Sequence, residues 1–110
     1  MINWDRVDEL REEVGAEDLV EVIELFLEEV EEVISRLQTA PDPSRYEEDL
    51  HFLKGSALNL GFRKFGALCE AGEKAAANGQ TESIVLNDII DAFFASKAIF
   101  AEKCSSLKVA

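Results

Sequence analysis

The single histidine of the chain, His51, lies in the stretch HFLKGSALNLGF, residues 51–62, beside residues that could support chemistry at its ring. On a helix, Lys54, Gly55 and Leu58 fall on one longitudinal strip with His51. A neutral imidazole is a competent nucleophile toward phosphorus. Lys54 can lean back toward the ring and steady the oxygens of a phosphoryl group on nitrogen. The bare backbone at Gly55 would let a second protein come close enough for in-line transfer, so the spacing favours a phosphoryl carrier.

Other interpretations of these residues stay open at this point. A lone histidine is more often a surface or packing residue, and Leu58 is more often a core residue than a docking residue. The chain could also be a helical adaptor that docks on a signalling partner without carrying phosphate. A haem or metal site with His51 as a ligand is disfavoured, because no second ligand stands at ligand spacing. Gly55 costs a helix about 1 kcal/mol relative to alanine, which indicates that something needs the space.

Composition limits the kind of partner. The formal net charge of −12 argues against a nucleic-acid groove and against adsorption to an anionic membrane. It is compatible with docking on a protein surface. Cys69 and Cys104 form no CxxC pair, so neither a disulfide framework nor a zinc site is indicated. The charged N-terminus lacks the apolar core of a signal peptide, and we expect a cytoplasmic protein.

The apolar spacing predicts an all-α fold. Five helical segments are expected, at about 4–14, 17–38, 44–60, 63–78 and from about 81 to beyond 100. Ser44 with Glu47 fits a capping box for the third segment, and Thr81 can cap the fifth. Short connections favour an antiparallel up-down-up-down four-helix bundle, with the first short helix as a cap or extension. The whole chain, 1–110, is expected to be one domain, with a motif-bearing core at about 16–104.

The turn expected near Gly61 and Phe62 sets the register between the third and fourth segments. Antiparallel pairing across that turn places residues at the same height when their numbers sum to about 123 or 124. His51 then lies level with Gly72 and Glu73. Glu73 could accept a hydrogen bond from one ring N–H and leave the other nitrogen free, although it could equally be an ordinary surface carboxylate.

The string HFLKGSALNLG resembles the H-x-L-K-G-S-x-x-x-L-G signature of histidine phosphotransfer (HPt) domains, the phosphocarriers of two-component phosphorelays. The helical segments LVEVIELFLEEVEEVISRL and LCEAGEKAAANG resemble the family's helices before and after the site. The likeness covers roughly residues 16–79.

This resemblance implies a role for each matched residue. His51 would be the phosphoryl acceptor and donor, Lys54 the lysine that steadies the phosphate, and Gly55 the glycine that gives access. Glu73 falls where many relatives have an amide or other polar group on the imidazole, and an acid there would also repel phosphoryl oxygens. Leu58 would belong to the docking strip.

The resemblance also implies the partners. These are the receiver domain of a response regulator, which supplies the aspartate and Mg²⁺, and a sensor or hybrid histidine kinase. The chain itself would bind no cofactor and would act as a monomer. It has no Gly-rich nucleotide loop and no second histidine, so we expect no kinase activity of its own.

Overall fold

The computed structural model describes the backbone of residues 2–109 and the side chains of residues 2–102. This part of the chain folds into five α-helices joined by short connections and two 3-10 turns. The helices are α1 (Trp4–Val14), α2 (Ala16–Thr39), α3 (Tyr46–Leu60), α4 (Arg63–Ala77) and α5 (Leu86–Val109), and the 3-10 turns are η1 (Pro43–Arg45) and η2 (Thr81–Ser83). The predicted all-α class is confirmed.

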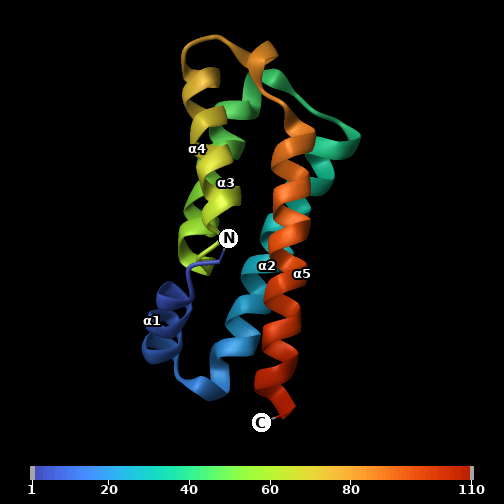
Figure 1. The fold of residues 1–110 in the computed structure, drawn as a ribbon. Helices are drawn as coiled ribbons and strands as arrows, with labels where there is room; N and C mark the ends of the chain where they lie inside the picture. The colour runs from blue at the N-terminus through green and yellow to red at the C-terminus, as the bar shows by residue number, and fades with distance from the viewer. Residues whose placement is uncertain (1, 110) are drawn as a thin grey trace.

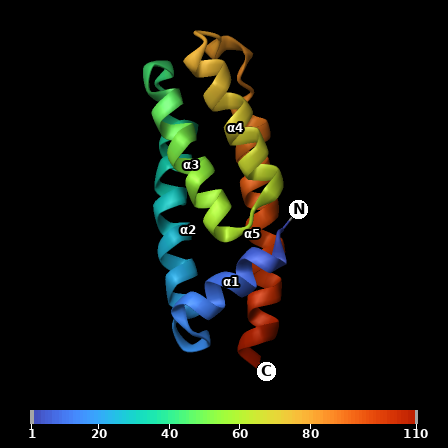
Figure 2. The same cartoon turned by 90° about the vertical axis from the view of Figure 1, so that its left-hand side faces the viewer.

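Helices α2 to α5 form the bundle, with each helix antiparallel to the next along the chain (Figures 1 and 2). The chain ascends in α2, descends in α3, ascends in α4 and descends in α5, which is the predicted up-down-up-down order. The pair α3 and α4 has the most extensive contact of any two helices. Side chains of α3 and α4 are therefore held close together along this contact.

Unequal helix lengths explain where α1 lies. At 1.5 Å per residue, α2 and α5 with 24 residues each are about 36 Å long, whereas α3 and α4 with 15 residues each reach only about 22 Å. The lower halves of α2 and α5 therefore extend past the α3–α4 turn. Helix α1 crosses beneath that turn and covers the exposed end (Figure 2). The first helix is thus the cap of the bundle.

The core is built from the apolar faces of the helices. On α3 the buried residues recur every three or four positions, namely Tyr46, Leu50, Leu53, Ala57 and Leu60. Phenylalanines fill the lower part of the bundle, where Phe62 lies 6.3 Å from Phe93 and 5.6 Å from Phe100 between ring centroids. Trp4 of α1 stacks on Phe100 at 5.7 Å, so the cap shares this aromatic cluster.

Two predicted helix starts are wrong. Asp42, not Ser44, is the capping residue before α3, because its carboxylate accepts hydrogen bonds from the Ser44 backbone N–H and hydroxyl. Pro43 then begins the 3-10 turn η1, which separates this cap from α3. Thr81 likewise begins η2 and does not cap α5, which starts only at Leu86. Ile84, between η2 and α5, packs against the core. Its backbone is extended, which interrupts the helix at this point.

Candidate functional site

Helix α3 presents His51 to solvent. Its neighbour Leu50 and the following Leu53 are fully buried, and together they fix the rotation of the helix about its axis. His51 lies on the opposite side, and 70% of its side chain is exposed. The imidazole is therefore accessible from solvent.

Helix α4 brings Glu73 to the ring at the predicted height. Glu73 Oε2 lies 2.9 Å from His51 Nδ1, and the residue numbers sum to 124. The close approach of the two helices depends on Gly72, where an added Cβ would lie only 2.8 Å from Leu50 Cδ1. A side chain at position 72 would therefore require either the buried Leu50 side chain or α4 itself to shift.

Lys54 binds the same carboxylate as the histidine. Its Nζ lies 2.7 Å from Glu73 Oε1, so Glu73 bridges the imidazole and the ammonium. We expected Lys54 to lean over the ring, and the structure instead has its charge on the carboxylate that holds the ring. Oε1 is buried and accepts no hydrogen bond of regular geometry among the described residues, so the Lys54 charge is what balances it.

The charges of this triad follow from its contacts. Lys54, and to a smaller extent His51, lower the pKa of Glu73 below its usual value, while Glu73 raises the pKa of Lys54. Glu73 is therefore ionised at neutral pH and can only accept hydrogen bonds. It follows that Nδ1 of the neutral ring carries the proton and that Nε2 carries the free lone pair.

Open space adjoins the ring along α3. An added Cβ at Gly55 would meet no atom within 4 Å, and Leu58 is 66% exposed. His51, Gly55 and Leu58 thus form an accessible strip on the outer side of α3. Ser56, the residue after Gly55, is buried and does not belong to this strip.

Sequence analysis missed one ion pair that orients α3. Asp49 is 4% exposed, and its two carboxylate oxygens accept hydrogen bonds from the Arg36 guanidinium of α2 at 2.7 and 2.9 Å. This bidentate pair is two residues from His51 and fixes α3 against α2. The available signal was an acidic residue adjoining the buried stripe, which requires a cationic partner on a neighbouring helix.

No second nucleophile or metal cluster adjoins the ring in the part of the chain that the structure describes. Cys69 is fully buried, and burial raises the pKa of its thiol to about 12. Within residues 2–102, no three potential metal-ligating side chains gather in one place. The chemistry that this face offers is that of one imidazole, one carboxylate and one ammonium.

Comparison with known families confirms the resemblance that the sequence shows. The family profile described as "Hpt domain" matches residues 21–95, which include α3, α4 and the His51 triad. The chain belongs to the Hpt domain family. Hpt domains carry phosphoryl groups on histidine in two-component signalling, and they are phosphocarriers without an enzymatic activity of their own.

Hpt domains interact with receiver domains and kinases in phosphorelays. No curated protein and no solved structure matches this Hpt domain significantly. Among its described residues, no helix combines the length and the apolar character needed to cross a bilayer.

Proposed function

We propose that this Hpt domain carries its phosphoryl group on Nε2 of His51 and exchanges it with the aspartate of a response-regulator receiver domain. The observation that supports this most is the combination of an exposed ring with an occupied Nδ1. Glu73 holds Nδ1–H at 2.9 Å, so the nucleophilic nitrogen is the one that faces solvent.

The transfer requires no proton movement at the ring. The Nε2 lone pair attacks the phosphorus of an aspartyl phosphate, the bond from phosphorus to the aspartate oxygen breaks, and the aspartate leaves as a carboxylate. The ring then carries phosphorus on Nε2 and a proton on Nδ1, so it is cationic. The Glu73 carboxylate beside Nδ1 stabilises that cation, and the reverse reaction returns the phosphoryl group.

Glu73 thereby helps transfer, although it also carries negative charge near the phosphoryl oxygens. A ring that stays protonated on Nδ1 is a better leaving group, because it departs from phosphorus as a neutral imidazole. Lys54 offsets the repulsion, since its ammonium is already held at the site by Glu73 Oε1. Its flexible side chain can move from that oxygen to a phosphoryl oxygen.

We place the chain in the cytoplasm as a monomer, between a sensor or hybrid histidine kinase and a response regulator. The receiver supplies Mg²⁺ and the aspartate, and Gly55 and Leu58 form the strip of α3 on which it docks. Support comes from the openness of this strip, where a Cβ at Gly55 would have no neighbour within 4 Å.

Phosphotransfer profiling tests the proposed function. The chain is incubated with each phosphorylated receiver domain of its source organism, and incorporation is measured over time. We expect one phosphoryl group per chain, labile in acid and stable in alkali, which peptide mass spectrometry at neutral pH locates on His51. Folded protein that accepts phosphate from none of the receivers would refute the proposal.

The substitution Glu73→Gln tests the part played by the carboxylate. The amide keeps the shape of the side chain but no longer fixes the Nδ1–H tautomer or balances the cationic ring. We expect labelling of His51 by the small donor phosphoramidate to slow about tenfold, which corresponds to about 1.4 kcal/mol in activation free energy. Glu70→Gln is the matched control, because Glu70 is an exposed acid on the same helix that pairs with Lys74. Equal rates in both variants would remove Glu73 from the mechanism.

The same variant has a pH-dependent effect on stability. The pKa of Glu73 is lower in the folded than in the unfolded chain, so its ion pairs stabilise the fold above the usual carboxyl pKa, 4.5. That contribution disappears as the pH falls through the lowered value. Urea denaturation should therefore find Glu73→Gln less stable than the wild type at pH 7, with the difference shrinking below pH 4.5.

A further inference from the structure

A groove of about 450 Å³ continues from the His51 strip toward the lower end of α3 and α4. Lys54, Leu58 and Glu70 line the groove together with Asn3 and Arg63, and Glu70 is already paired with Lys74 of the same helix. Small residues let α3 and α4 pack closely beneath the groove, since an added Cβ at Gly66 would lie only 3.3 Å from the Cβ of Ala57. Leu58 is seven residues from His51, or about 10 Å along the helix, so a protein docked over the ring also covers the groove.

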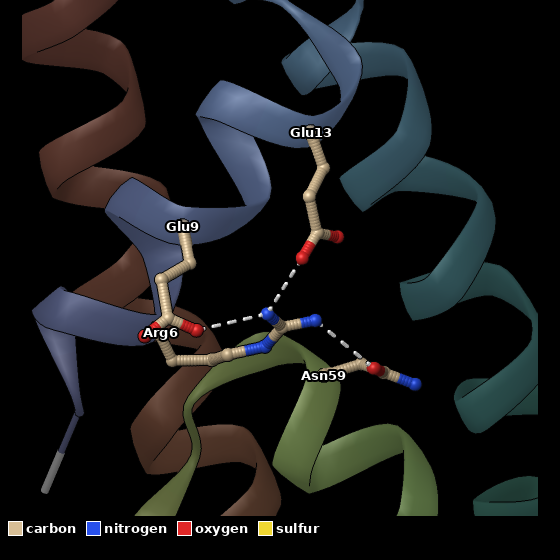
Figure 3. Close-up of polar contacts among 4 residues, drawn as sticks. All are labelled: Arg6, Glu9, Glu13 and Asn59. Atoms are coloured by element: carbon tan, nitrogen blue, oxygen red, sulfur yellow. Dashed lines mark hydrogen bonds and ion pairs between the residues drawn. The ribbon is translucent and has the colours of Figure 1, made fainter.

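Asn3, the residue before α1, forms a fixed end wall for this groove. The Asn3 backbone N–H donates to the Gly61 carbonyl oxygen at 2.6 Å. Arg6 adds a hydrogen bond to the Asn59 side chain at 3.3 Å, and Glu9 and Glu13 hold its guanidinium in place (Figure 3). The wall is therefore tied to the α3–α4 turn through both backbone and side-chain contacts.

One cation at the groove has no partner among residues 2–102. Lys54 is paired with Glu73 and Arg6 with its two glutamates, whereas exposed Arg63 has no ion pair or hydrogen bond from its side chain among the described residues. Arg63 also lies in the first turn of α4, which contains no acidic residue. A cation there is unfavourable for the helix dipole, and an incoming carboxylate would relieve this.

We propose that this groove is a second docking point for the receiver domain, which rests on the function proposed above. An apolar side chain of the receiver packs against Ala57 and Leu58, and a receiver carboxylate pairs with Arg63. Two features support this occupant. The groove is continuous with the His51 strip, and it offers an uncommitted guanidinium in a chain of net charge −12. Arg63 then discriminates among receivers, together with Asn3 at the end of the groove.

Paired charge reversals test the proposal. Lys64→Glu is the matched control for Arg63→Glu, because Lys64 is the next residue, is exposed, lies in the same helical turn and does not line the groove. Isothermal titration calorimetry measures the Kd of each variant of the 110-residue chain for the receiver domain that binds the wild type most tightly. We expect Arg63→Glu to weaken binding at least about tenfold and Lys64→Glu less than about twofold. Equal weakening, or none, would overturn the proposal.

A second pair of variants tests the volume of the groove independently of charge. Ala67→Phe places a ring in the groove, whereas Ala77→Phe places the same ring at the exposed end of α4. We expect only Ala67→Phe to raise the Kd for the receiver, by about tenfold or more. An unchanged Kd would show that the receiver does not enter the groove.

Labelling by phosphoramidate tests the carrier function without involving the groove, because a small donor needs no docking surface. We expect all four variants to be phosphorylated on His51 by phosphoramidate at the wild-type rate. Normal labelling with normal receiver binding in Arg63→Glu and Ala67→Phe would refute the groove and leave the carrier function intact. Absence of labelling in the wild type, with receiver binding still sensitive to Arg63, would refute the carrier function and support the groove.

Discussion

Replacing His51 by glutamine should abolish phosphoryl transfer and leave the fold unchanged. Nε2 of His51 is the nucleophile in the proposed reaction, and a glutamine amide has no lone pair of comparable basicity to replace it. The side chain is 70% exposed, so the free energy of unfolding should change by less than about 0.5 kcal/mol. Labelling by phosphoramidate and by the cognate phosphorylated receiver should both fall below detection, while the helical circular dichroism spectrum and the urea midpoint stay at their wild-type values.

The same variant decides between a carrier and an adaptor. An adaptor that only docks on a receiver needs Leu58 and its surroundings but no imidazole. Receiver binding by His51→Gln, measured by calorimetry, should remain because the docking strip is intact, whereas signalling in cells should be lost. Full signalling by this variant would mean that the chain acts by docking alone. Leu58→Asp is the complementary control, expected to weaken receiver binding while phosphoramidate still labels His51.

The contact between His51 and Glu73 could be predicted from the sequence because it depends on few quantities. The apolar stripe fixes the rotation of α3, the turn at Gly61 fixes the register, and 1.5 Å per residue then brings residue 51 level with residue 73. Gly61 has φ of 76°, in the left-handed region that ends a helix, as the sequence suggested. Errors in helix length remain small over the eleven positions that separate His51 from Phe62 at the centre of that hairpin.

Helix geometry alone does not predict which group the Lys54 ammonium pairs with. Both the imidazole and Glu73 are within reach of a four-carbon side chain, and the choice depends on how closely α3 and α4 approach. That approach is set by Gly72 against Leu50, a contact between side-chain positions that no periodicity specifies. A carboxylate is also the stronger partner for an ammonium, so Lys54 pairs with Glu73.

The sequence did not predict the helix starts or the groove, for two further reasons. Asp42 and Ser44 are both good caps, and local sequence does not say which carboxylate or hydroxyl reaches the free N–H groups. The groove is made by segments far apart in sequence, since Asn3 meets Gly61 only because α1 crosses beneath the α3–α4 turn. This crossing depends on the difference in length between two helix pairs, a property of the assembled bundle.

Substituting Gly55 should change stability and phosphoryl transfer in opposite directions. No atom lies within 4 Å of the position that a Cβ would take, so Gly55→Gln fits the folded chain without strain. Because glutamine is a better helix former than glycine, we expect the free energy of unfolding to rise by about 0.5 kcal/mol. The longer side chain stands beside His51 where the receiver must approach, and transfer to the receiver should slow about 100-fold, as small displacements of reacting groups do.

Three measurements separate this effect from other causes. Urea denaturation should give a higher midpoint for Gly55→Gln than for the wild type, which excludes loss of fold as the reason for slow transfer. Phosphoramidate should still label His51, because a small donor can pass beside the new side chain. Gly55→Ala, which adds only a methyl group, should gain about 1 kcal/mol of stability and lose far less of the transfer rate. Wild-type transfer by Gly55→Gln would mean that no partner approaches along this part of α3, and the helix would then carry its glycine for no reason connected with His51.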